Sequence, residues 1–336
     1  MTTYVVTGGA GFIGSNFVRL TLESRPQVAM VDIDLLTYAG NLENLADVPR
    51  DRHTFIRADI TDPEAMRRAI PEGADLLINF AAETHVDRSI LGPLAFVRTN
   101  VLGTQVLLDV AREKGVKRFI QISTDEVYGS LEPDEPPFTE DWPLDPSSPY
   151  AASKTSADLL VLASHHTYGQ NVGITRCSNN YGPYQFPEKL IPLMISNAME
   201  DKPLPVYGDG RQVRDWIFTD DHSRAILAVA ENGQPGEVYN IGARSERYNI
   251  DVVREILRQL GKPESLIQFV TDRPGHDRRY AMDPTRLSTE LGWHPAVDFE
   301  EGLGRTILWY QQHVDWWQRV RDGSYREFYD KWYGNR

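Results

Sequence analysis

The sequence predicts an α/β fold, built around a doubly wound parallel sheet with a second, smaller α/β domain. Short β-branched runs alternate with helical segments through the first half of the chain, the order that parallel sheets require. A glycine-rich turn joins the first predicted strand to the first predicted helix, as in many nucleotide-binding sheets. After Ser178, prolines and aromatic residues become frequent, which indicates that a different substructure begins there.

The predicted elements follow one another in regular order. Strands are expected over 3–7, 28–34, 54–58, 75–79, 117–123 and 172–176. Helices are expected from 12 through 22, over 63–70, over 93–114 and around Tyr150. The later segment 216–242 contains a helix and a strand over 238–241, and it is expected to rejoin the sheet. The predicted domains are therefore 1–178 plus about 215–245, and about 179–214 plus 246–336.

The glycine-rich turn over 8–14 reads Gly-Gly-Ala-Gly-Phe-Ile-Gly. Its glycines allow a tight turn, and they let backbone amides and the helix N-terminus approach a pyrophosphate. Because the turn follows a strand and opens a helix, it predicts a Rossmann-type dinucleotide-binding domain.

The second predicted strand carries the residue expected to select the dinucleotide. Asp34 lies 20 residues after Gly14, where an acidic side chain binds the ribose hydroxyls of adenosine. Asp32 is an alternative for this role. Neither Lys nor Arg occurs between residues 28 and 41, so nothing there would bind a 2′-phosphate. The sequence therefore favours NAD over NADP.

A further pair of motifs combines two kinds of chemistry. Tyr150 and Lys154 are four residues apart, so on a helix they share one face. An ammonium beside a phenol lowers the pKa of the phenol, which would make Tyr150 a base for an alcohol proton. Asp125 and Glu126 follow a predicted buried strand, at the end of the sheet where ligands bind. Alcohol oxidation does not need this additional acid and base, so we expect an elimination as well.

Composition predicts a cytoplasmic enzyme. The 336-residue chain is 41% hydrophobic and has one cysteine, Cys177, which fits a reducing compartment. The N-terminal segment has no secretory signal, and no apolar run is expected to approach membrane-spanning length. The net charge of −13 argues against a nucleic-acid partner. We therefore expect neither a nucleic-acid nor a membrane partner, and no metal site is predicted.

An anionic substrate would need a local group of cations in this acidic chain. The second half contains Arg211, Arg214, Arg273, Arg278 and Arg279, which together could hold a diphosphate. Asp side chains occur close to all of them in the sequence. We expect Arg211 and Arg279 to pair with such neighbours, and Arg214 and Arg273 to bind the substrate.

Several long stretches resemble the extended short-chain dehydrogenase/reductase family, and within it the dTDP-glucose 4,6-dehydratases. The stretches are GGAGFIG, LTYAGNLENL, AAETHVDRS, STDEVYG, YAASK, SNNYGPYQFPEKLIPL, YGDGRQVRDWI and DRPGHDRRYA. The triplet Thr124, Asp125 and Glu126 is the discriminating feature, because related 4-epimerases lack the acid and base. Thr84 departs from the usual Ser of these dehydratases but keeps the hydroxyl.

The resemblance implies a three-step reaction of a nucleotide-sugar substrate. Tyr150, aided by Lys154 and with Thr124 bound to the same oxygen, removes the 4-hydroxyl proton as hydride passes to NAD. Glu126 then removes the proton of carbon 5 while Asp125 protonates the departing 6-hydroxyl. Return of the hydride to carbon 6 gives a 4-keto-6-deoxy sugar nucleotide. Alternatives are a UDP-glucose 4,6-dehydratase, a 4-epimerase or decarboxylase, and an NAD-sensing regulator.

The resemblance also implies the binding residues. Those expected at the cofactor are Gly8, Gly11, Phe12, Ile13, Gly14, Asp34, Asp59, Ile60, Ala81, Thr99, Tyr150, Lys154 and Asn180. Those expected at the substrate are Thr84, Thr124, Asn179, Lys189, Leu190, Tyr207, Arg214, Asn249, Arg273 and His276. For His276 a structural role is an alternative.

Two helices of the first domain predict a homodimer. The helix over 100–114 and the Tyr150 helix carry more apolar residues than contact with one sheet face requires. The residues concerned are Val101, Leu102, Val106, Leu107, Val110 and Ala111, and Leu159, Leu160, Val161, Leu162 and Ala163. Pairing across a two-fold axis would bury the second faces in a four-helix bundle. Coverage by the second domain is the alternative.

Overall fold

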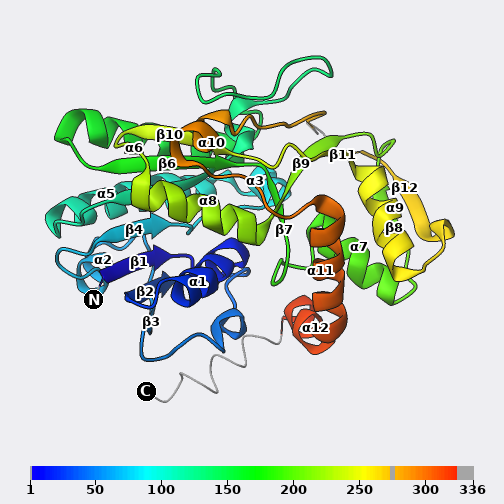
Figure 1. Cartoon of the computed structure of the whole chain (residues 1–336), viewed down its shortest axis with the longest axis horizontal. Coiled ribbons are helices and arrows are strands. Elements are labelled where there is room, and N and C mark those ends of the chain that lie inside the picture. Colours follow the sequence, from blue (N-terminus) through cyan, green and yellow to red (C-terminus); the bar gives the residue numbers. More distant parts are fainter. Residues whose placement is uncertain (1, 273–276, 324–336) are drawn as a thin grey trace.

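A computed structural model describes residues 2–272 and 277–323 and confirms the predicted fold class (Figure 1). A seven-stranded parallel sheet has the order β10-β6-β5-β4-β1-β2-β3. Its strands are β1 (Thr2–Thr7), β2 (Val28–Asp34), β3 (His53–Arg57), β4 (Leu76–Asn79), β5 (Phe119–Thr124), β6 (Val172–Cys177) and β10 (Glu237–Ile241). The strand order reverses between β1 and β4, and open sheets bind ligands at the carboxyl ends of strands around such a point.

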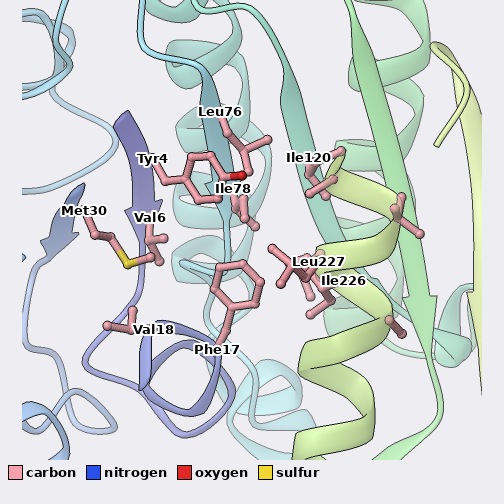
Figure 2. Packing of buried hydrophobic residues seen from close by; sticks show 14 of the residues in the cluster. Tyr4, Val6, Phe17, Val18, Met30, Leu76, Ile78, Ile120, Ile226 and Leu227 are labelled. Atoms are coloured by element: carbon pink, nitrogen blue, oxygen red, sulfur yellow. The ribbon is translucent and has the colours of Figure 1, made fainter. Parts of the chain in front are cut away.

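Helices cover both faces of this sheet. On one face lie α1 (Phe12–Ser24) and α8 (Thr219–Asn232), and α10 (Thr285–Leu291) packs on α8 and β10. Figure 2 shows Phe17 of α1 and Leu227 of α8 pointing at the sheet side chains Ile78 and Ile120. The other face is covered by α2 (Pro63–Ala69), α5 (Gly103–Glu113) and α6 (Pro149–Tyr168). Burial of apolar side chains on both faces stabilises the sheet, at roughly 25 cal/mol for each Å² removed from water.

The predicted helix over 93–114 is observed as a continuous run with a change of pitch. It comprises α4 (Pro93–Phe96), the π-helical turns of η2 (Val97–Leu102) and α5. Wide turns of this kind occur often at functional sites. By length and composition alone, Pro93–Glu113 is the one described helical run that could span a membrane, with 44% of its apolar window buried within the protein. The expectation that no apolar run approaches that length is wrong on these criteria.

A second group of elements follows β6. Strands β7 (Asn179–Tyr181), β9 (Val213–Phe218) and β11 (Glu246–Tyr248) form a sheet in the order β11-β9-β7, and β8 (Leu204–Tyr207) pairs with β12 (Ile267–Val270). The helices of this second group are α7 (Leu190–Met199), α9 (Asn249–Leu260), α11 (Phe299–Gln312) and α12 (Val314–Asp322). These elements share a core that includes the buried Trp316 and Trp317. Strand β10 rejoins the large sheet as expected, whereas the division of the chain into domains stays a prediction.

Candidate active site

A cavity of about 370 Å³ lies at the carboxyl ends of the central strands. All of the predicted cofactor residues line it: Gly8, Gly11, Phe12, Ile13, Gly14, Asp34, Asp59, Ile60, Ala81, Thr99, Tyr150, Lys154 and Asn180. The remaining predicted catalytic residues, Thr124, Asp125 and Glu126, line the same cavity. A second cavity, of about 500 Å³, lies beside α12 and contains none of these residues.

The glycine turn has no room for side chains at two of its positions. Gly8 has a φ of +75°, and a Cβ there would lie 2.6 Å from the Ala81 amide nitrogen. A Cβ at Gly14 would lie 2.3 Å from the Gly8 carbonyl oxygen. Helix α1 begins immediately after Gly11, so its first amides face the cavity beside the turn. This geometry suits a bound pyrophosphate.

The two candidate ribose ligands occupy different environments. Asp34 lines the cavity, where its Oδ2 accepts a hydrogen bond from the Ala10 amide at 3.1 Å and its Oδ1 accepts one from Leu36 at 2.7 Å. Burial and the nearby Asp32 charge raise the pKa of Asp34 to about 7. Asp32 is fully buried and accepts a hydrogen bond from the Gly9 amide at 3.1 Å. The geometry therefore favours Asp34 for the ribose and gives Asp32 a supporting position.

Several buried polar atoms of the cavity wall are suited to hydrogen-bond a ligand. Within the described residues, those without a hydrogen-bond partner include Ser123 Oγ, Asp125 Oδ2, Ser178 Oγ, Asn179 Oδ1, Asn180 Oδ1 and Gln185 Oε1. Buried polar atoms are normally paired, so such a concentration marks a binding site. Together with the glycine turn and Asp34, these residues fit a dinucleotide.

Tyr150 and Lys154 lie on the cavity face of α6, as their spacing predicts. The helix begins with Pro149 and is capped by the Ser148 hydroxyl, which accepts from the Ala151 amide at 3.1 Å. This cap places Tyr150 in the first turn and the buried Lys154 one turn later. The Lys154 ammonium donates to the Ile122 carbonyl at 2.6 Å, and burial lowers the pKa of Lys154.

The expected lowering of the Tyr150 pKa is wrong for this structure. Burial, followed by the charges of Glu126 and other neighbours including Asp125, raises the pKa of Tyr150 well above its ordinary value. Lys154 directs its ammonium to a backbone carbonyl instead of opposing those charges. A further positive charge in the cavity would favour the phenolate at this position.

The acid and base pair follows β5 in a short turn, η3 (Asp125–Tyr128). The Thr124 hydroxyl caps this turn by accepting from the Glu126 amide at 3.3 Å, and it donates to Asp125 Oδ1 at 3.1 Å. Burial and the neighbouring Glu126 charge raise the pKa of Asp125 to about 8. Asp125 therefore holds a proton near neutral pH, as a general acid must.

The predicted substrate residues are only partly brought together. Thr84, Thr124, Asn179 and Lys189 line the cavity, whereas Leu190, Tyr207, Arg214 and Asn249 do not. Arg273 and His276 lie outside the described residues. The binding roles of the four residues that do not line the cavity, and those of Arg273 and His276, stay predictions.

The arginines differ in their surroundings. The Arg214 guanidinium donates to the Val213 and Asp277 carbonyls at 2.7 and 3.0 Å. Arg279 is paired as expected, although its partner is Glu246, at 2.6 Å. The guanidinium of Arg211 instead lies 5.6 Å from the centre of the Tyr248 ring. Asp209 pairs with Arg278 at 3.1 Å, and among the described residues the expected carboxylate pairing of the Arg211 side chain is not observed.

Sequence reasoning missed several residues at the cavity mouth. Tyr38, Glu83, Phe186 and Glu188 line the cavity from three separate loops. Arg88 lies 3.8 Å from the centre of the Tyr38 ring, and it is 3.8 Å from Glu188. These residues fall within the long loop stretches that carry the family resemblance, and this was the available signal.

A parallel sheet with this glycine turn, an acidic residue at the end of β2 and a buried Tyr–Lys pair defines an NAD-dependent enzyme of the short-chain dehydrogenase/reductase class. The family model described as GDP-mannose 4,6 dehydratase matches residues 5–306. The chain belongs to this family.

Relatives and solved structures agree with this assignment. A dTDP-glucose 4,6-dehydratase of Xanthomonas campestris is 53% identical, over 97% of this chain and 98% of the relative. The dTDP-glucose 4,6-dehydratase of Streptomyces venezuelae, solved with NAD and TYD bound, has a TM-score of 0.91 and 48% identity, covering 95% of this chain and 100% of that one. A UDP-glucose 4-epimerase of Thermotoga maritima has a TM-score of 0.86 and 29% identity, covering 93% and 100%.

Proposed function

We propose that this chain converts dTDP-glucose to dTDP-4-keto-6-deoxyglucose as an NAD-dependent 4,6-dehydratase. The observation that carries the proposal is the presence of two catalytic sets in one cavity. Tyr150 and Lys154 suit oxidation of an alcohol, and Asp125 and Glu126 suit an elimination. The names and bound ligands of the similar dehydratases support the same substrate.

The oxidation step uses Tyr150 as the base. When bound, NAD supplies the hydride carrier and a positive charge that opposes the carboxylates around Tyr150. The Tyr150 oxygen then takes the proton of the 4-hydroxyl, and the Thr124 hydroxyl holds the same sugar oxygen. Lys154, fixed by the Ile122 carbonyl, keeps a second positive charge on this side of the cavity.

The elimination step uses the two carboxyl groups after β5. A 4-ketone makes the proton of carbon 5 acidic, and Glu126 removes it. Asp125 gives its proton to the departing 6-hydroxyl, so water leaves and a double bond forms between carbons 5 and 6. Glu126 returns the proton to carbon 5 once hydride has reached carbon 6. The different environments of the two carboxyls allow one to act as acid and the other as base.

Mass spectrometry with labelled substrate tests this proposal. Incubation with dTDP-glucose carrying deuterium at carbon 4 should give a product that has lost one water and holds deuterium at carbon 6. UDP-glucose in a parallel reaction tests the choice of nucleotide, and we expect slower turnover. An unchanged mass would indicate an epimerase or an inactive protein. Transfer of deuterium to a second, distinguishable sugar in the mixture would contradict return of the hydride within one active site.

We also propose a homodimer formed through the helices on the outer side of α6. Side chains exposed there include Leu91 (89%) and Leu94 (77%) of α3 (Val86–Leu91) and α4, Leu102 of η2 (49%) and Leu159 of α6 (53%). The elements α3, α4 and η2 all pack against α6. The exposed apolar side chains named above therefore come from elements that are neighbours in the structure. Clustered exposed apolar groups favour a partner, and a second copy of the chain would bury them in the predicted bundle.

The structure corrects part of the reasoning behind this dimer. Leu107, Val110, Ala111 and Val161 are fully buried within one protomer, because they face the sheet and neighbouring helices. They cannot provide a second apolar face. A charge at Leu107 would disrupt the core, so it does not test the interface.

Replacing Leu102 or Leu159 with Glu should split the dimer. Each change places a charge in a surface that the dimer would bury. The free-energy cost of burying an unpaired charge exceeds the roughly 1.5–3 kcal/mol gained by burying a leucine. Light scattering should give twice 38.1 kDa for the unchanged chain and 38.1 kDa for the variants. Leu308→Glu is the matched control, since Leu308 is equally exposed (53%) and lies on α11. A monomeric unchanged chain would refute the proposal.

A cytoplasmic location, without nucleic-acid or membrane partners, is part of the proposal. The single cysteine is a buried free thiol, which suits a reducing compartment. The net charge of −13 disfavours binding to nucleic acids and to anionic lipid surfaces.

A further inference from the structure

Asp32 supports the glycine turn from beneath. The side chain is 0% exposed, and its Oδ1 accepts the Gly9 amide hydrogen at 3.1 Å. A Cβ at Gly9 would lie 2.2 Å from the same oxygen, so the turn rests directly on this carboxyl group. A buried carboxylate is stable only when its charge is opposed.

His53 is the partner of this carboxyl group. This residue begins β3, the edge strand beside β2, and its Nε2 lies 3.4 Å from Asp32 Oδ2. The side chain of His53 is 8% exposed. Within the described residues, neither atom has a hydrogen-bond partner. The ion pair is therefore the polar contact available to both atoms.

The charge of Asp32 also acts on Asp34, two residues further along β2. Burial is the main cause of the raised pKa of Asp34, and the Asp32 charge is the next. Asp34 lines the cavity at the end of β2, where the ribose hydroxyls are expected. An ionised carboxylate accepts hydrogen bonds from hydroxyls more strongly than a neutral acid does. An unopposed charge on Asp32 would thus weaken Asp34 as a ligand.

We propose that His53 is a positioning residue for the dinucleotide site: it pairs with Asp32 and so holds in place the carboxyl group that accepts the Gly9 amide hydrogen of the glycine turn. The inference rests on the proposed binding of NAD in this cavity and is independent of the proposed sugar chemistry.

Calorimetric titration of the full chain with NAD tests the role of His53. His53→Gln keeps a polar side chain but removes the imidazole that pairs with Asp32, and we expect NAD to bind about tenfold more weakly. His294→Gln is the matched control, because His294 is exposed, and it should leave the affinity unchanged. An affinity of His53→Gln within about twofold of the unchanged chain would overturn the proposal.

A double-mutant cycle separates pairing with Asp32 from packing. Asp32→Asn keeps an oxygen that can accept from the Gly9 amide but removes the carboxylate that pairs with His53. In that background, adding His53→Gln should change NAD affinity by less than about twofold. A tenfold loss that persists there would show that His53 acts by packing, which overturns the proposal. If His53→Gln alone is too unstable to purify, comparing Asp32→Asn with the double variant still tests for a packing role, and no result depends on turnover of the sugar.

Discussion

Tyr150→Phe should reduce the rate of substrate oxidation by about 10²–10⁴-fold, the usual contribution of a positioned base. The change removes the oxygen that takes the 4-hydroxyl proton and keeps the ring, which packs edge-on against Phe96 at 6.3 Å. Without proton removal, hydride cannot leave carbon 4, so the later steps fail as well. Single-turnover absorbance of the reduced nicotinamide measures the first step directly.

The control for this variant is Tyr168→Phe on the same helix. Tyr168 is 58% exposed at the end of α6, and its hydroxyl is far along the helix from the cavity. Its loss should leave the oxidation rate unchanged. If Tyr150→Phe kept more than about a tenth of the normal rate, the base would have to be another group, and the assignment of Tyr150 would fail.

The sheet could be predicted from the sequence because its signals are local. The strand over 28–34 and the segment that rejoins the sheet as β10 are β-branched runs between turns, and both are observed. The glycine turn and the Tyr–Lys spacing likewise depend on neighbours within a few residues. Asp125 and Glu126 come directly after one buried strand. Because parallel strands place their carboxyl ends at a shared edge of the sheet, the position of this pair at the ligand-binding edge could be predicted.

Features that depend on the tertiary structure could not be predicted this way. Asp32 and His53 are on neighbouring strands but 21 residues apart in sequence, and no local pattern links them. Apolar periodicity marked Leu102 and Leu107 alike, yet one is half exposed and the other is buried. The raised pKa of Tyr150 also depends on burial and on the carboxylates of the turn after β5, which spacing within α6 does not reveal.

Asp125→Asn should separate oxidation from elimination. Asn has nearly the same shape but cannot donate the proton that the departing 6-hydroxyl needs, so water loss should slow by about 10²–10⁴-fold. Tyr150, Lys154 and Thr124 are unchanged, and oxidation at carbon 4 should proceed. Stopped-flow absorbance should then show reduced nicotinamide accumulating on the enzyme, while the exposed control Asp141→Asn shows no accumulation.

The pH dependence of the same step gives a second test of Asp125. Its pKa is raised to about 8 by burial and by Glu126, so the acid form is present below that pH and is lost above it. The rate of water loss by the unchanged chain should therefore fall as the pH rises through about 8, and Asp125→Asn should lack this decline. Equal slowing of oxidation and elimination in the variant, with no reduced nicotinamide observed, would instead show that Asp125 serves an earlier step or the structure of the cavity.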